Sequence, residues 1–105
     1  MKDLKGKKVL VTGASGGIGK AIALELSSSG ADLCLTGRNK TKLENLQKII
    51  GGNCQIIISD LSNSQGIENL ADQAQKIMGQ IDILVNNAGI TKDNLFIRMS
   101  EDDWN

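Results

Sequence analysis

Four short apolar runs alternate with amphipathic segments along the chain, and this alternation is the feature that most limits its fold. The runs lack the strict period of two that marks a half-exposed strand, as expected for strands covered on both faces of a parallel sheet. They are residues 7–12 (KKVLVT), 31–36 (ADLCLT), 54–59 (CQIIIS) and 81–86 (IDILVN).

The segments between these runs carry apolar residues at helical spacing. One predicted apolar face comprises Leu43, Leu46, Ile49 and Ile50, and the next comprises Ile67, Leu70, Ala71, Ala74, Ile77 and Met78. Gly30, Gly51 and Gly79 stand where such helices end. Right-handed crossovers between parallel strands then predict an α/β fold, a Rossmann-like doubly wound sheet of about four strands in spatial order 3-2-1-4. We expect one domain over residues 1–105.

Composition excludes several classes of partner. Twelve basic and twelve acidic residues cancel, so no net charge draws the protein to nucleic acid or to an anionic membrane. No apolar run approaches the ~20 residues of a membrane span, and the start MKDLKGKK lacks the apolar stretch of a signal peptide. We therefore expect a cytoplasmic protein. Cys34 and Cys54 lack metal-ligand spacing and the chain has no histidine, which favours reduced core thiols and no metal site.

The segment TGASGGIG, residues 12–19, lies where the first run gives way to the first helical pattern. A glycine-rich turn at that place lets backbone approach a phosphate, while the helix N-terminus presents free N–H groups and a positive dipole end. The spacing of Gly13, Gly17 and Gly19 is G-x-x-x-G-x-G. The alternative is that these glycines serve only close packing between helix and strand.

Two further motifs accompany the glycine turn: Asp60-Leu61 after the third run and N-N-A-G at residues 86–89 after the fourth. Together the three resemble the cofactor-binding half of the short-chain dehydrogenase/reductases. That resemblance implies that the glycine turn surrounds a pyrophosphate, that Asp60 and Leu61 contact adenine, and that residues 86–89 run under the ribose. The site residues it implies are Gly13, Ser15, Gly17, Ile18, Gly19, Arg38, Asp60, Leu61, Asn87, Ala88 and Gly89.

Two of these assignments have structural alternatives. Asp60 could be a helix-capping or turn aspartate before the third helix. Asn86 and Asn87 could be an amide pair that braces the edge of the sheet, a role compatible with cofactor binding.

The end of the second run predicts which dinucleotide binds. NAD sites commonly place an acid there to accept hydrogen bonds from the ribose hydroxyls. Here the segment is LTGRN, residues 35–39, without a carboxylate. Arg38 instead offers a guanidinium that can bind a 2′-phosphate through two hydrogen bonds, which favours NADP(H). The alternative is a solvated arginine at the start of the second helix.

The resemblance also implies a catalytic half that this chain does not contain. In the family an Asn, a Ser and a Tyr-x-x-x-Lys pair lie downstream of N-N-A-G, and the chain has no tyrosine. Ser100 and Asp103 have the form of a capping box at the start of a helix. We therefore expect an incomplete domain, with no catalytic residue and no activity on its own.

Within the family, residues 86–105 resemble the bacterial 3-oxoacyl-[acyl-carrier-protein] reductases. The resemblance implies NADPH-dependent reduction of an acyl-carrier-protein thioester in fatty acid biosynthesis, and a homo-oligomer, a tetramer. Two alternatives stay open. One is a short-chain reductase of a small carbonyl compound, and the other is a non-catalytic NADP-binding protein.

Overall fold

The computed structural model describes residues 3–88, which form an alternating series of strands and helices. Gly89 and the helix predicted to begin at Ser100 lie outside the described residues. The elements are β1 (Lys8–Thr12), α1 (Gly17–Ser28), β2 (Asp32–Gly37), α2 (Lys40–Ile50), β3 (Cys54–Ile58), α3 (Ser64–Met78) and β4 (Ile83–Asn86).

The strands form one parallel sheet in the order β3-β2-β1-β4, which confirms the predicted fold and strand order. β1 lies inside the sheet, where Leu10 is in register with Cys34 of β2 on one side and with Leu84 of β4 on the other. The chain builds outward from β1 to β3 and then crosses to the far side of β1. This reversal places a crevice at the carboxyl ends of β1 and β4, where open α/β sheets bind their ligands.

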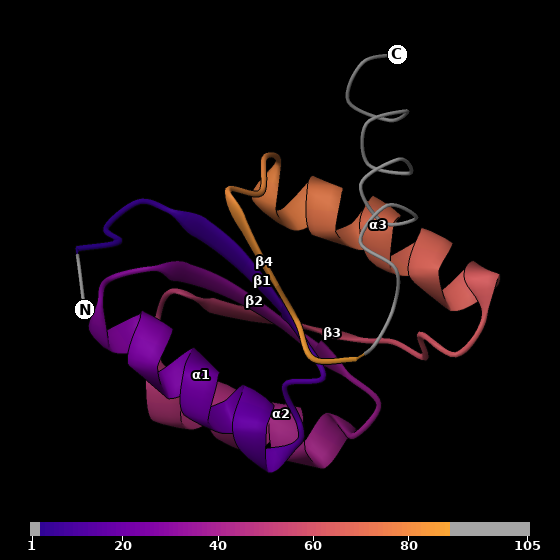
Figure 1. The fold of residues 1–105 in the computed structure, drawn as a ribbon, viewed down its shortest axis with the longest axis horizontal. Coiled ribbons are helices and arrows are strands. Elements are labelled where there is room, and N and C mark those ends of the chain that lie inside the picture. The colour runs from indigo at the N-terminus through magenta and orange to yellow at the C-terminus, as the bar shows by residue number, and fades with distance from the viewer. Residues whose placement is uncertain (1–2, 89–105) are drawn as a thin grey trace.

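Helices cover both faces of the sheet, with α1 and α2 on one face and α3 on the other (Figure 1). Because successive strand residues point to opposite faces, Val9 and Val11 pack with α1 and α2, while Leu10 packs with α3. All three side chains are fully buried. Burial on both faces explains why the strands read as continuous apolar runs.

Two residues of the predicted helical faces are wrongly assigned, because Ile49 is 61% exposed and Ile77 is 45% exposed. Steps of three residues turn a helix by about 300°, so the apolar stripe drifts away from the core. By the last turn of α2 Ile50 has taken the core-facing position and Ile49 points outward. At the end of α3, Met78 is the buried residue.

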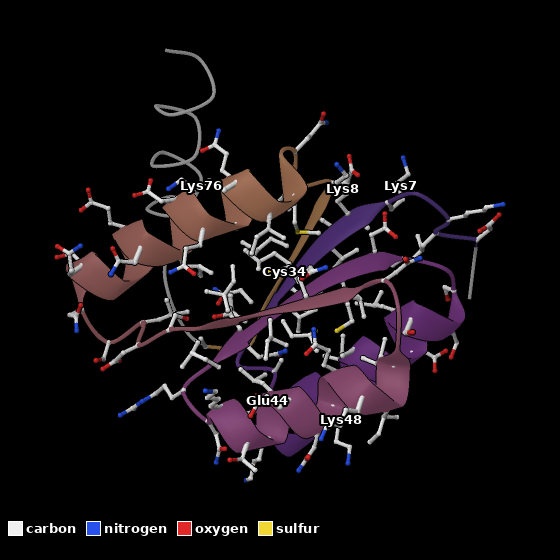
Figure 2. All side chains as sticks on the ribbon, turned by 180° about the vertical axis from the view of Figure 1, so that it is seen from behind. Lys7, Lys8, Cys34, Glu44, Lys48 and Lys76 are labelled. Atoms are coloured by element: carbon white, nitrogen blue, oxygen red, sulfur yellow. The ribbon has the colours of Figure 1, made fainter. Side chains whose placement is uncertain are left out.

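Both cysteines are free and buried, as predicted for core thiols. Burial raises the pKa of Cys34 to about 12, with a smaller contribution from Cys54, and burial raises the pKa of Cys54 to about 11. Neither thiol is therefore a thiolate near neutral pH. Figure 2 shows Cys34 between the helical layers. Within residues 3–88, no helix is long and apolar enough to cross a membrane.

Candidate cofactor-binding site

The loops that follow the strands meet at the carboxyl edge of the sheet around a cavity of about 290 Å³. Parallel register aligns the strand ends, since Thr12 is opposite Asn86 and Gly37 is opposite Ile58. We name this space the adenosine cavity. Its lining residues are Gly13, Ser15, Gly37, Arg38, Ser59, Asp60, Leu61, Ser62 and Ala88.

The helix that starts at the glycine turn has an unusual N-terminus among the described helices. Gly16 is the N-cap of α1 and makes no side-chain capping bond, and the first turn has no acidic residue. By contrast, Asn39 caps α2 and Asn63 caps α3 through their side-chain oxygens. The N-terminal N–H groups of α1 therefore lack a side-chain acceptor, and an anion is the ligand that such groups bind.

The three motif glycines have different physical roles. Gly13 has a φ of 65°, and a Cβ there would lie 3.1 Å from the carbonyl carbon of Asn87. A Cβ on Gly19 would collide with the backbone oxygen of Gly13 and would lie 2.8 Å from the Cα of Ala14. A Cβ on Gly17 would meet nothing within 4 Å. Close packing thus explains Gly13 and Gly19, while the space beside Gly17 fits approach by a phosphate.

The hydroxyl of Thr12 joins the end of β1 to the loop after β4. Its oxygen accepts hydrogen bonds from the backbone N–H groups of Asn87 at 3.0 Å and Ala88 at 3.2 Å. It donates to Oδ1 of Asn86, 3.0 Å away. One buried hydroxyl therefore uses its donor and both acceptor positions. This contact gives Asn86 the bracing role considered as its structural alternative.

Asp60 is a turn residue that also faces the adenosine cavity. Its Oδ1 accepts from the hydroxyl of Ser62 at 2.6 Å and from the backbone N–H of Ser62 at 3.0 Å. The Ser62 hydroxyl, then its N–H group, and finally the charge of Arg38 lower the pKa of the Asp60 carboxyl. Asp60 is therefore an anionic acceptor at neutral pH, whereas the cap of α3 is Asn63.

Ser15 and Arg38 lie together where β2 ends. A Cβ on Gly37 would be 2.8 Å from the Ser15 hydroxyl oxygen, so this hydroxyl lies directly against Gly37. The backbone N–H of Ala14 donates to the carbonyl of Thr36 at 3.0 Å, which ties the glycine turn to β2. No acidic residue occupies the end of β2, so a hydroxyl and a guanidinium border the cavity where an NAD site commonly has a carboxylate.

The cavity gathers part of the predicted set. The predicted residues that line it are Gly13, Ser15, Arg38, Asp60, Leu61 and Ala88. Ile18 is 73% exposed beside the turn and Asn87 is exposed after β4, whereas Gly19 is buried under the loop. The individual binding roles of these residues stay predictions.

Sequence reasoning assigned no role to Thr12 or Ser62. The spacing Asp60-x-Ser62 is a recognisable turn pattern, since a hydroxyl two residues on can bond the aspartate. Thr12 gave no such signal, because its partners lie more than 70 residues away. Among residues 3–88 no group of three potential metal ligands is found.

The fold and the site define a dinucleotide-binding protein of the Rossmann-like class. The family model described as short chain dehydrogenase matches residues 7–105, nearly the whole chain. The chain belongs to this family, which confirms the resemblance inferred from its motifs.

Its curated relatives include both nodulation proteins and 3-oxoacyl-[acyl-carrier-protein] reductases. Nodulation protein G of Rhizobium sp. (strain N33) is 49% identical over 104 residues, which cover 99% of this chain and 42% of the relative. The 3-oxoacyl-[acyl-carrier-protein] reductase FabG of Haemophilus influenzae is 43% identical over 101 residues, 96% of this chain and 42% of that protein. The chain thus spans about two fifths of the length of these relatives.

Solved structures share the fold closely. A Pseudomonas aeruginosa RhlG/NADP complex superposes with a TM-score of 0.78 at 37% identity, covering 85% of this chain and 36% of that one. A metagenomic short-chain oxidoreductase in complex with NADP gives 0.76 at 43% identity, covering 83% and 41%. An NAD+-bound xylitol dehydrogenase gives 0.78 at 34%, covering 85% and 35%. The two NADP complexes agree with the cofactor predicted from Arg38.

The different surroundings of Gly17 and Gly19 predict that a substitution at Gly17 lowers cofactor affinity, whereas one at Gly19 lowers stability. Gly17→Ala should preserve or slightly raise the free energy of unfolding, because alanine is favourable in a helix and meets no atom there. It should weaken cofactor binding about tenfold, roughly 1.4 kcal/mol, by blocking phosphate approach. Gly19→Ala should instead destabilise the fold by about 1–3 kcal/mol through overpacking. Urea denaturation and NADPH titration of both variants test this; unchanged binding by Gly17→Ala would contradict it.

The Thr12 contacts predict that removal of the hydroxyl lowers both stability and cofactor affinity, and that serine at this position restores both. Thr12→Val keeps the shape but removes the acceptor for the Asn87 and Ala88 N–H groups. We expect a stability loss of about 1–2 kcal/mol and weaker cofactor binding, because the loop after β4 loses its anchor. Thr12→Ser retains the hydroxyl and should recover most of both. Equal behaviour of the valine and serine variants in denaturation and NADPH titration would show that the hydroxyl bonds contribute little.

Proposed function

We propose that this chain binds NADP(H) and forms the cofactor-binding part of an NADPH-dependent reductase. The observation that carries the proposal is the composition of the adenosine cavity, where Arg38 and Ser15 lie at the end of β2 and no carboxylate follows that strand. A carboxylate there would repel a 2′-phosphate, whereas a guanidinium binds one through two charge-assisted hydrogen bonds. The space beside Gly17 and the N–H groups of α1 suit the pyrophosphate.

Other residues at the cavity have proposed roles in binding the adenine and in positioning the loop after β4. The Asp60 carboxylate, oriented by Ser62, can accept a hydrogen bond from the adenine amine. Thr12 fixes the loop after β4, which by family resemblance leads toward the nicotinamide. When bound, NADPH supplies the hydride. By the same resemblance, the proton comes from a tyrosine downstream of this chain.

For the substrate, we propose the 3-oxo group of an acyl-carrier-protein thioester, reduced to the 3-hydroxy form in fatty acid biosynthesis. The FabG relatives support this substrate, and residues 86–105 resemble the same reductases. With it we propose a cytoplasmic homo-oligomer, a tetramer by family resemblance. The xylitol and hydroxysteroid dehydrogenases among the structural neighbours support a second candidate, a reductase of a small carbonyl compound. A non-catalytic NADP-binding protein is the third.

Cofactor preference is the direct test of the proposal. Arg38→Asp should reverse a preference for NADPH over NADH, because the new carboxylate repels the 2′-phosphate and accepts from the ribose hydroxyls. A charge-assisted contact of about 1.5–3 kcal/mol corresponds to roughly ten- to more than a hundredfold in the affinity ratio. Fluorescence titration with both cofactors measures it. Lys48→Asp makes the same charge change in the last turn of α2 and serves as the control. An unchanged ratio in Arg38→Asp would make Arg38 a surface residue only.

The second test concerns residues 1–105 alone. We expect no reduction of an acetoacetyl thioester with NADPH, because the chain has no tyrosine to donate the proton. We also expect a tendency to aggregate, because β4 is an edge strand of the sheet that residues 3–88 form and the net charge is zero. Turnover by a monomeric 1–105 polypeptide would refute the assignment of catalysis to downstream residues. NADPH binding without turnover, together with a coding sequence that ends at Asn105, would favour the non-catalytic candidate.

A further inference from the structure

A cavity of about 210 Å³ lies at the amino edge of the sheet, at the opposite end of the strands from the adenosine cavity. It lies between the starts of three neighbouring strands and the end of α3, and we name it the amino-edge cavity. Its lining includes Lys8 of β1, Asp32 of β2, Gln55 of β3, and Ile77 and Met78 of α3. Sequence analysis assigned no ligand to any of these residues.

We propose that the amino-edge cavity binds an arginine side chain of a partner protein, and that the Asp32 carboxylate pairs with its guanidinium. Three features support this binding: an unpaired charge, apolar walls and the size of the cavity. The inference does not depend on the proposed function, because this cavity shares no lining residue with the adenosine cavity.

The Asp32 carboxylate is the charged group of the cavity that has no partner. Lys8 is in register with Asp32, but its ammonium group donates to the carbonyl oxygen of Met78 at 2.5 Å, at the end of α3 (Figure 2). The backbone N–H of Lys8 donates to Oδ2 of Asp82 at 2.8 Å. Within residues 3–88, the Asp32 carboxylate has neither a hydrogen bond nor an ion pair. Because Asp82 and the carboxyl end of α3 offset the charge of Lys8, Asp32 is left to attract a cation.

The donors of a guanidinium fit the acceptors that line the cavity. Among the described residues, Lys8 is the one lysine or arginine that lines it. Gln55 is in register with Cys34, two residues after Asp32, so Gln55 and Asp32 lie on the same face of the sheet. A guanidinium has five N–H donors in one plane, which can bond both oxygens of a carboxylate and a neighbouring amide oxygen. An ammonium group lacks this planar geometry, so arginine fits better than lysine.

The walls and the size of the cavity fit one side chain with an apolar stem. Ile77 is 45% exposed beside the cavity, and Met78 and Leu33 also line it. The methylene groups of an arginine pack against such a surface while the charged end reaches a carboxylate. The volume of about 210 Å³ is below the ~300 Å³ at which pockets for drug-sized molecules begin. The cavity therefore fits a single side chain and not a whole nucleotide or acyl thioester.

The test is a titration of the complete protein with N-acetyl-arginine methylamide, which presents the side chain as a protein chain does. The backbone amide NMR signals of Asp32, Gln55 and Ile77 should shift with a dissociation constant on the order of 10 mM. N-acetyl-citrulline methylamide has nearly the same shape without the charge and should give no saturable shift. High salt should weaken binding of the arginine probe, because screening reduces exposed charge contacts.

Two variants of the cavity and one matched control identify the residues that bind the probe. Asp32→Asn should weaken binding at least about tenfold, because it removes the charge and keeps the shape. Gln55→Lys supplies a competing cation and should weaken binding as well. Asp72→Asn should leave binding unchanged, since Asp72 is exposed on α3 and lies outside the cavity. Circular dichroism checks folding, and NADPH titration should give the same affinity for all three variants, because the cavity lies at the opposite edge of the sheet.

The outcomes decide between an arginine site and its alternatives. Equal shifts by the arginine and citrulline probes would show that the cavity does not recognise charge and would overturn the proposal. Equal weakening by Asp32→Asn and Asp72→Asn would indicate a general charge effect and would overturn it too. Tighter binding of agmatine, which has the guanidinium without the peptide groups, would assign the cavity to a free cation and exclude the protein partner. Saturable binding of the arginine probe that both cavity variants weaken and Asp72→Asn preserves supports the proposal.

Discussion

The hydrogen bonds that hold β1 in parallel register between β2 and β4 are the constraint on which the site depends. Parallel pairing in register brings all strand ends to one edge, so loops distant in sequence meet there. Thr12, at the end of β1, completes the pairing with bonds to the loop after β4. Because the Thr12 hydroxyl holds this loop where the β1–β4 pairing ends, contacts that stabilise the fold also position Ala88 in the wall of the adenosine cavity.

The glycines of the turn differ in what surrounds them. Gly19 lets α1 approach the turn closely, and Gly13 adopts a backbone conformation that other residues rarely take. Gly17 faces space that a side chain would reduce. The packing interpretation of the motif therefore holds for Gly13 and Gly19, and the phosphate-binding interpretation stays a prediction that the space beside Gly17 fits. A spacing pattern cannot separate them, because it records which residues are glycine and not which atoms surround them.

The chain has no net charge, but charged and dipolar groups of opposite sign gather at the carboxyl edge of the sheet. The uncapped start of α1 brings partial positive charge to the glycine turn, and Arg38 brings a full positive charge to the lining of the adenosine cavity. Asp60, held by Ser62, provides the anionic acceptor across the adenosine cavity. A nucleotide with a phosphate at one end and an amine donor at the other complements this arrangement, because each end meets charge or dipole of the opposite sign.

The sequence by itself determined the alternation of strands and helices, the sheet order and the motif loops, because each follows from local periodicity and from the restricted handedness of crossovers. It misplaced Ile49 and Ile77, since a helix end drifts relative to the core it covers. Only the tertiary structure decided that Thr12 anchors the β4 loop and that the Ser15 hydroxyl lies against Gly37 at the end of β2. Those relations join residues on different strands and helices, and such contacts exist only once the sheet has paired.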